Sequence, residues 1–404
     1  MRLFLAVITF SVLGGSAWAA DPSGTGLDPD RLALIPERMQ EFVDEGTVAG
    51  VVSLVARHGK IGALDAVGYT DIQTKQPIAT DAIFQLHSMT KPVVCLGVLM
   101  LMEEGQLALT DPVEKHLPEF RGQRVVAEQH ADGRITLKKP SRPINFIDLM
   151  THTSGMPLNP PPGIGELHRT LHKTLNETVL VASQQPLLFE PGTQWQYSNM
   201  GVAALARTIE VLSGMAFEKF LEARIFKPLG MDDTFIYPPK SKFHRMPTAY
   251  IQRDGKPVKY VDDPLGEGVM KFREGAKYPL PEGGLYSTAS DLFPLYQLML
   301  NRGEYKGVRL VSPATVVLMT TLHTGDLQVS GGTGFGWGLG WSIVRKPGAL
   351  GPASVGTYGH GGRYGAYCFL DPKRDMIGIF LIHREGGSDE RNMFVQIAIS
   401  AAVD

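Results

Sequence analysis

The sequence predicts an α/β (α+β) protein in which a sheet flanked by helices carries an inserted, mostly helical subdomain. Alternating, strand-like runs stand near the start of the chain and again near its end. Between them, from about residue 110 to residue 282, short helical patterns are separated by Pro and Gly. We therefore expect residues 20–110 and 283–404 to form one α/β unit, and residues 111–282 to form the helical subdomain.

The elements of the first third follow from capping, alternation and turn signals. Asp28-Pro29-Asp30 is a helix start, and the apolar spacing behind it runs to a glycine turn. Residues 50–57 and 61–67 alternate as strands do, and the short polar link between them predicts a hairpin. Residues 91–104 are apolar at most positions and stop at a glycine, which predicts a buried helix.

Strand signals return in the last third of the chain. They cover residues 335–344, 360–370 and 376–382, and the polar turn 371–375 separates the last two. Residues 392–403 are then apolar at helical spacing. We expect these strands to pair with the N-terminal strands in one sheet, and the C-terminal helix to pack on that sheet.

Composition bounds the function classes. The chain has 404 residues, of which 43% are hydrophobic and 20% charged, as in an ordinary globular protein. Its net charge of −2 and the lack of a Lys/Arg run with interleaved aromatics exclude an electrostatic footprint for nucleic acid. We expect no nucleic-acid partner, and a small molecule as the ligand.

The N-terminus has the pattern of a cleavable secretory signal. A short basic start, an apolar stretch over residues 4–13 and the small-residue ending Ala17-Trp18-Ala19 predict a signal peptide over residues 1–19. A buried first helix or a membrane anchor is the alternative interpretation. No Cys follows the cleavage site and no later segment is long and apolar enough to span a bilayer. We therefore expect a periplasmic or secreted protein without a transmembrane anchor in the mature chain.

Two cysteines, Cys95 and Cys368, are the only ones in the chain, and both stand inside apolar runs. This setting favours small buried hydrophobic residues, although export would permit a disulfide between them. The eleven histidines show none of the spacings of a zinc site. We expect neither a metal nor an organic cofactor.

One motif carries the chemistry of a nucleophile. Ser88-Met89-Thr90-Lys91 is the single Ser-x-x-Lys that opens a predicted helix, and three residues are nearly one helical turn. Ser88 and Lys91 therefore share a face, and a helix start offers unpaired N–H groups to a developing oxyanion. The helix behind Lys91 is apolar, so its ammonium is expected to be partly buried and shifted toward the neutral, proton-accepting form. A second motif, Tyr197-Ser198-Asn199, follows a Pro-Gly turn.

Together these motifs resemble the serine β-lactamase and DD-peptidase superfamily, in its class C-like branch. The stretches around residues 149–155 and 283–291 are similar to family VIII carboxylesterases. The resemblance covers nearly the whole mature chain. It implies an antiparallel sheet of five or more strands with helices on both faces, and a catalytic cleft between this sheet and the helical subdomain.

The third motif of this superfamily has two candidates. His323-Thr324-Gly325 matches its letters but follows a helical pattern, whereas His360-Gly361-Gly362 opens a strand hairpin near the C-terminus. We choose His360, because the superfamily places this motif on a strand that lines the cleft, and interpret His323 as a solvated loop residue.

The resemblance implies a role for each residue. Ser88 would attack the acyl carbonyl, and Lys91 and Tyr197 would carry its proton to the leaving group. The N–H groups of Ser88 and Arg363 would hold the oxyanion, and Asn199 would orient Lys91 and the substrate. We interpret His152 as a loop histidine that bonds its own turn, and Trp337 and Trp341 as core or cleft wall on one strand face.

Substrate preference remains open among three hypotheses. His360 replaces the Lys of most β-lactamases and is mostly neutral at pH 7, which favours a carboxylesterase acting on small acyl esters. A D-Ala-D-Ala carboxypeptidase or β-lactamase-type amide hydrolase is the alternative, because Arg363 could supply a charge. The third hypothesis is a non-catalytic ligand-binding protein on the same fold.

Overall fold

The computed structural model describes residues 23–160, 172–253, 256–259 and 275–403. The predicted signal peptide, residues 1–19, lies outside the described residues and stays a prediction. Among the described residues, no single helix has the length and apolarity to cross a membrane. The helices at Asn199–Ser213 and Phe217–Leu229 meet the length and composition criterion only as a pair, which is bent by 75°.

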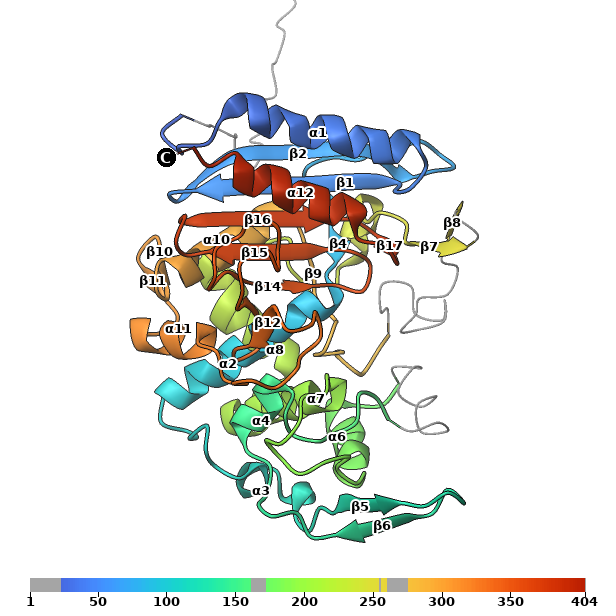
Figure 1. The fold of residues 1–404 in the computed structure, drawn as a ribbon, viewed down its shortest axis with the longest axis vertical. Coiled ribbons are helices and arrows are strands. Elements are labelled where there is room, and N and C mark those ends of the chain that lie inside the picture. Colours follow the sequence, from blue (N-terminus) through green and yellow to red (C-terminus); the bar gives the residue numbers. More distant parts are fainter. Residues whose placement is uncertain (1–22, 161–171, 254–255, 260–274, 404) are drawn as a thin grey trace, which may run out of the picture.

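Eight antiparallel strands form the main sheet, which Figure 1 shows beside its helices. In spatial order the strands are β12 (Phe335–Trp337), β13 (Ser342–Val344), β14 (Tyr358–Gly361), β15 (Tyr367–Asp371), β16 (Met376–Leu381), β1 (Gly50–Arg57), β2 (Lys60–Asp71) and β3 (Gln76–Pro77). The N-terminal hairpin joins the C-terminal strands because β1 pairs with β16 in register Val52 to Leu381. The predicted fold class is confirmed.

Both faces of the sheet are covered, as the side chains of β1 show. All eight residues of this strand are buried. Val52 and Leu54 belong to one apolar cluster, and Val51 and Val55 belong to another. Alternate residues of a strand point to opposite faces, so β1 lies between two cores.

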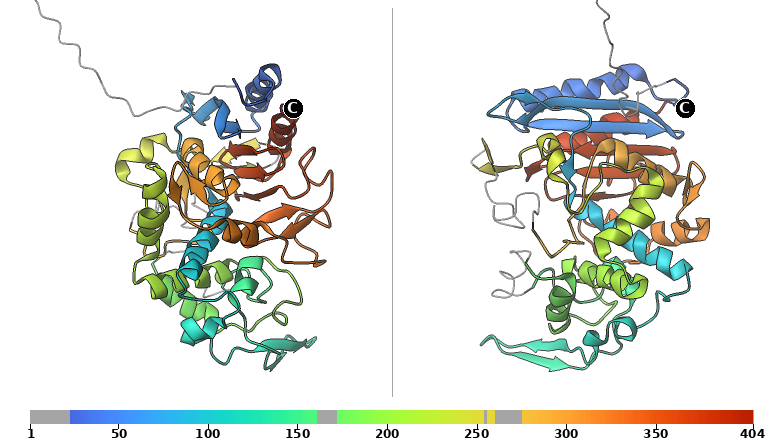
Figure 2. Two further views of the ribbon diagram at one scale, coloured as in Figure 1. Left: turned by 90° about the vertical axis from the view of Figure 1, so that its left-hand side faces the viewer. Right: turned by 180° about the vertical axis from the view of Figure 1, so that it is seen from behind.

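Long helices cover both faces of the sheet. On one face lie α1 (Pro29–Asp44) and α12 (Asp389–Ser400), and on the other lie α2 (Lys91–Glu103) and α10 (Ala289–Leu300), as the left view of Figure 2 shows. The predicted cap of α1 is present, since the Asp28 carboxylate accepts the backbone N–H groups of residues 30 and 31.

The middle of the chain contains short helices and two hairpins. Its helices are α3 (Val113–His116), α4 (Phe146–Thr151), α6 (Leu175–Ser183), α7 (Asn199–Ser213), α8 (Phe217–Leu221) and α9 (Lys227–Leu229), with a π-helical turn at Glu222–Phe226. The hairpins are β5 (Val125–Gln129) with β6 (Ile135–Lys138), and β7 (Tyr250–Arg253) with β8 (Lys256–Lys259). Sequence analysis expected a mostly helical subdomain here and did not predict these two hairpins.

Smaller elements complete the described fold. They are the 3₁₀ segments His87–Thr90, Pro118–Phe120 and Lys240–Arg245, the helix α11 (Pro313–Thr320), and the two-residue strands β4 (Phe84–Gln85), β9 (Tyr286–Ser287), β10 (Glu304–Tyr305), β11 (Val308–Arg309) and β17 (Arg384–Glu385). The pairing of β4 with β9 brings the chain just before Ser88 against the segment that follows residue 283.

One predicted strand is two strands. Residues 335–344 fold back on themselves, because β12 pairs with β13 in a hairpin. Gly340 has a φ of 85° in the turn, and a Cβ there would stand 2.8 Å from Cys95 Sγ. Trp337 therefore ends β12 and Trp341 directly precedes β13, so the two residues do not share one face of one strand. Both cysteines are buried and free, as the sequence favoured.

Candidate active site

Ser88 lies in a 3₁₀ turn directly before α2. The turn spans His87–Thr90 and α2 begins at Lys91, where the predicted helix over residues 91–104 begins. In a 3₁₀ helix, residues three apart are eclipsed, which brings Ser88 and Lys91 together more closely than an α-helix does. Lys91 Nζ donates a hydrogen bond to Ser88 Oγ at 3.0 Å.

Lys91 is enclosed by protein. Only 1% of its surface is exposed. Its ammonium nitrogen also donates to the carbonyl oxygen of Glu282 at 2.7 Å and lies 4.6 Å from the centre of the Tyr197 ring. Burial lowers the pKa of Lys91 to about 7, against an opposing effect of the Glu282 carboxylate. A substantial fraction of Lys91 is therefore neutral near pH 7 and able to accept a proton.

Tyr197 also lies beside the nucleophile. It precedes Ser198, whose side chain caps α7. The Tyr197 side chain is hydrogen-bonded to Ser88, and burial raises its pKa above the usual 10. Its hydroxyl also lies 3.4 Å from His360 Nε2. Because the phenol keeps its proton at neutral pH, it suits passing a proton on rather than acting as a permanent anion.

His360 lies on β14, opposite Cys368 of β15. Its Nδ1 is 2.8 Å from the carbonyl oxygen of Gly361, which can only accept, so Nδ1 carries the proton and Nε2 is free to accept from Tyr197. Burial, and then the charge of Lys91, lower the pKa of His360 to about 3. His360 is therefore a neutral member of the site.

His323, the other candidate for the third motif, is held at the end of α11. Its Nε2 donates to the carbonyl oxygen of Leu318 at 2.8 Å, and its ring is half-buried rather than solvated. This hydrogen bond does not link His323 to Ser88.

The Gly-Gly turn after His360 lies against the chain that leads to the nucleophile. A Cβ on Gly362 would stand 2.4 Å from the carbonyl oxygen of Leu86, so only glycine permits this approach. The turn thus places Gly362 against Leu86, two residues before Ser88. The guanidinium of Arg363 points elsewhere, because its Nε donates to Glu385 Oε1 at 2.8 Å.

Asn199 is not joined to Lys91 in this structure. Its Nδ2 donates to Asn159 Oδ1 at 2.9 Å, while both hydrogen bonds that the structure gives Lys91 go to Ser88 and Glu282. As the first residue of α7, Asn199 projects from the helix start toward the loop that carries Asn159. The predicted orienting role toward Lys91 has no hydrogen bond to support it.

An aromatic wall next to Tyr197 was underestimated from the sequence. His152 is buried at the end of α4, and its ring centre lies 4.3 Å from that of Tyr197. Its Nδ1 accepts the backbone N–H of Ser198 at 3.2 Å, so it does not merely bond its own turn. Trp195 and Trp337 contact the His152 ring edge-on. The motif around residue 152 was visible in the sequence, but these partners were not.

Two further residues beside the nucleophile gave no local signal. His87 has a φ of 48° and is buried directly before Ser88, with its ring 4.2 Å from that of Tyr364. Strained backbone of this kind clusters at functional sites. Glu282 reaches Lys91 from 191 positions further along the chain, and its Pro-Glu-Gly-Gly context is that of a turn.

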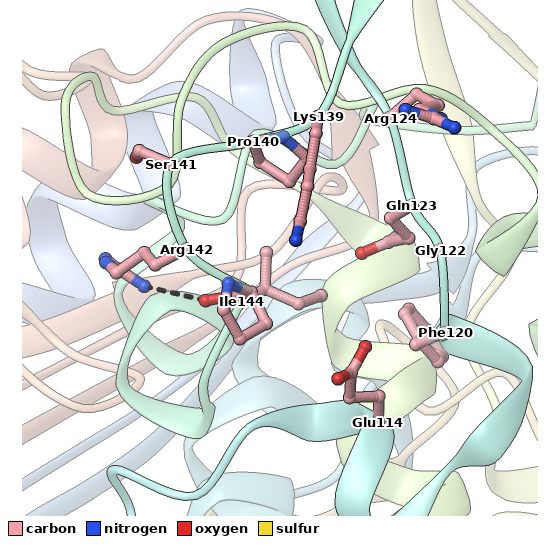
Figure 3. Close-up of a pocket in the computed structure, with 11 residues that line it drawn as sticks. Glu114, Phe120, Gly122, Gln123, Arg124, Lys139, Pro140, Ser141, Arg142 and Ile144 are labelled. Atoms are coloured by element: carbon pink, nitrogen blue, oxygen red, sulfur yellow. Dashed lines mark hydrogen bonds between the residues drawn. The ribbon is translucent and has the colours of Figure 1, made fainter.

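A separate pocket shares none of these residues. Figure 3 shows this cavity of about 290 Å³ beside the β5–β6 hairpin, with Lys139, Gln123 and Glu114 in its wall. Within the described part of the chain, no group of three or more His, Cys, Asp or Glu side chains is placed to hold a metal ion.

Comparisons with known proteins identify the family of this chain. Residues 35–402 match the Beta-lactamase family. Esterase EstB of Burkholderia gladioli is 31% identical over 386 residues, which cover 88% of this chain and 91% of that protein. A putative D-alanyl-D-alanine carboxypeptidase of Escherichia coli (strain K12) is 25% identical over 391 residues, covering 90% and 85%.

Among solved structures, EstCE1 superimposes with a TM-score of 0.78 at 27% identity, covering 93% of this chain and 99% of that one. It is described as a hydrolase with promiscuous acyltransferase activity. Fold, site and relatives together define a serine hydrolase. The chain belongs to the Beta-lactamase family, within the serine β-lactamase and DD-peptidase superfamily that includes esterase relatives.

Proposed function

We propose that this protein is an exported carboxylesterase that hydrolyses small, neutral acyl esters through an acyl-enzyme on Ser88. The observation that carries the proposal is the 3.0 Å contact from Lys91 Nζ to Ser88 Oγ. Burial brings the pKa of this lysine to about 7, so the base is partly neutral where the enzyme works. Two relatives, EstB and EstCE1, are described as an esterase and a hydrolase.

In the first half-reaction, Ser88 Oγ bonds to the acyl carbon while the ester C–O bond breaks. The serine proton passes to Lys91 and, through the Tyr197 hydroxyl, to the departing alkoxide oxygen. In the second half-reaction, water attacks the acyl carbon and gives a proton to the same pair. The bond from Ser88 Oγ to the acyl carbon then breaks, and Ser88 recovers its proton.

The oxyanion would be held by the backbone N–H groups of Ser88 and Arg363. Ser88 lies in the first turn of a helical segment, where N–H groups lack intrahelical acceptors. The close approach of Gly362 to Leu86 supports the second donor, because Arg363 follows Gly362 directly and Leu86 lies two residues before Ser88.

The charge states of two residues, His360 and Arg363, favour neutral rather than anionic substrates. His360 occupies the position of the lysine of the third motif but has a pKa of about 3, so it carries no charge near pH 7. The guanidinium of Arg363 is paired with the carboxylate of Glu385. A substrate carboxylate would therefore meet a neutral ring and an engaged guanidinium.

A D-Ala-D-Ala carboxypeptidase or β-lactamase-type amide hydrolase is the second candidate. One observation favours it: the Arg363 side chain is 46% exposed, so its surface ion pair is weak enough to exchange Glu385 for a substrate carboxylate. The related protein of Escherichia coli is described as a putative carboxypeptidase of this kind. The third candidate is a non-catalytic ligand-binding protein on the same fold.

A hydrolysis panel separates the three candidates. p-Nitrophenyl acetate or butyrate, nitrocefin and a D-Ala-D-Ala peptide are compared by kcat/KM, with Ser88→Ala as the control for uncatalysed breakdown. We expect the nitrophenyl esters to be the best substrates by a wide margin. Preference for nitrocefin or the peptide supports the amide hydrolase, and no activity above the control supports the binding protein.

Export is tested on the full chain expressed with its leader. Cleavage after Ala19 would leave Ala20 as the first residue of a protein outside the cytoplasm. N-terminal sequencing of the fractionated protein reads this directly. A soluble cytoplasmic protein that keeps Met1 contradicts the export proposal and leaves the catalytic one untouched.

A further inference from the structure

Glu282 contacts Lys91 from a loop outside all three catalytic motifs. The loop is a tight turn in which the Gly283 N–H donates to the Leu280 carbonyl oxygen at 2.9 Å. A Cβ on Gly283 would stand 3.4 Å from His87 Cα, which is ordinary van der Waals distance, so the turn lies against the residue before the nucleophile. The turn aims the Glu282 carbonyl oxygen at Lys91 Nζ, 2.7 Å away.

The side chain of Glu282 is also inside the protein. The residue is 5% exposed, and its Oε2 accepts a hydrogen bond from the Tyr278 hydroxyl at 2.9 Å within a fully buried contact. Holding the lysine requires only the main-chain carbonyl of residue 282. The buried carboxylate is thus an additional feature, and a buried carboxyl group is costly unless its environment uses the charge.

Several titratable groups face Lys91 from different elements. They are Cys95 of α2, His152 at the end of α4, Tyr197 before α7, His360 of β14, and Glu282. The two histidines have their pKa lowered and are neutral near pH 7, and the pKa values of Cys95 and Tyr197 are raised. Glu282 supplies the one carboxyl group of this set, and among its members it has the largest effect that raises the pKa of Lys91.

We propose that Glu282 is a positioning residue for Lys91 and that its carboxylate tunes the proton affinity of the lysine that activates Ser88. The inference rests on the proposed role of Lys91 as the base. Burial alone favours a neutral lysine, whereas a nearby carboxylate favours the ammonium. A lysine that must both take the serine proton and return it is most effective when these two effects balance close to the working pH.

The structure agrees with such a balance. Burial is the larger effect on Lys91, Glu282 is the largest opposing one, and the resulting pKa is about 7. Loss of the carboxylate should lower that pKa, so that Lys91 becomes neutral at a lower pH and is a weaker base. The pH at which the reactivity of Ser88 falls to half of its plateau on the acid side should then be lower.

The test measures how the rate constant for labelling of Ser88 by a fluorophosphonate probe depends on pH. This stoichiometric reaction reports nucleophile activation whichever substrate the enzyme prefers. The full chain is compared as wild type, Glu282→Gln, which keeps the shape and the carbonyl contact, and Glu282→Asp, which keeps the charge. Asp291→Asn, which removes a largely buried carboxyl on α10 that hydrogen-bonds to Thr234, controls for loss of any buried acid.

We expect a wild-type midpoint near 7. In Glu282→Gln it should fall by about one unit or more, the usual effect of one nearby charge. Glu282→Asp and Asp291→Asn should keep the wild-type midpoint. An unchanged midpoint in Glu282→Gln overturns the inference. If that variant does not fold, Glu282→Met gives the same test. Wild-type protein that is not labelled on Ser88 at any pH contradicts the proposed function instead.

Discussion

His152 and Tyr197 stack with their ring centres 4.3 Å apart and their planes tilted by 34°. The same histidine accepts the backbone N–H of Ser198 at Nδ1, so its proton is on Nε2. Burial lowers the pKa of His152 well below 6.5, which keeps this acceptor available across the neutral range. One neutral ring therefore supports both the tyrosine ring and the start of α7.

His152→Ala should lower kcat on the order of 10- to 100-fold with a smaller change in KM, because Tyr197 loses the ring that orients its hydroxyl. Residue 152 has a φ of 61°, so alanine also adds backbone strain. His152→Asn separates the two effects, since asparagine tolerates this conformation but supplies no ring. It should lose a similar factor in kcat while unfolding closer to the wild-type temperature. Wild-type kcat in His152→Asn would show that Tyr197 needs no such support.

The parts of the site that sequence could predict are those with local spacing. Ser88 and Lys91 are three residues apart, so any helical geometry brings them together. The strand pair at the N-terminus and the hairpin with His360 were visible as alternation. Each of these depends on neighbours within a few positions, where pattern and structure are directly linked.

What sequence could not supply depends on contacts between distant segments. Glu282 stands in a turn, and only tertiary packing brings it to Lys91. The side chain of Asn199 binds Asn159, and the side chain of Arg363 binds Glu385. Neither partner belongs to a recognised motif, so neither contact could be predicted. The hairpin within 335–344 was missed because its apolar residues continue through the turn.

Ser88→Ala should abolish both turnover and labelling by a fluorophosphonate probe. The serine is the one group of the site with a base at hydrogen-bond distance and a place in a helical turn. Peptide mapping of the labelled wild-type protein should locate the adduct on Ser88. Labelling that persists in Ser88→Ala means that another residue is the nucleophile.

Lys91→Ala and Tyr197→Phe should each lower kcat by about 10²–10⁴, the usual contribution of a positioned acid or base, with less effect on substrate binding. Both side chains interact with Ser88, and the proposed mechanism therefore has them act on one proton path. The double variant should therefore be far less impaired than the product of the two single effects. Full additivity in this cycle would assign the two residues to separate steps.

His360 gives the last prediction, because it stands at the position where the resemblance to β-lactamases leads one to expect Lys. His360→Lys would place a second ammonium beside Lys91, whose charge already acts on this position, and would remove the acceptor facing Tyr197. For neutral esters kcat/KM should therefore fall or stay level. His360→Gln is the matched neutral control, since its amide oxygen can still accept from Tyr197.

The pH profile of the wild type tests the same assignment without a substitution. The folded pKa of His360 is lowered to about 3, so the ring is neutral at every pH well above that value. Hydrolysis of nitrocefin or of a D-Ala-D-Ala peptide should consequently show no gain as the pH falls from about 8 toward about 6. A gain there, together with faster turnover of these anionic substrates in His360→Lys than in His360→Gln, would show that residue 360 binds a carboxylate. The esterase assignment would then be wrong, while the roles of Ser88, Lys91 and Tyr197 would stand.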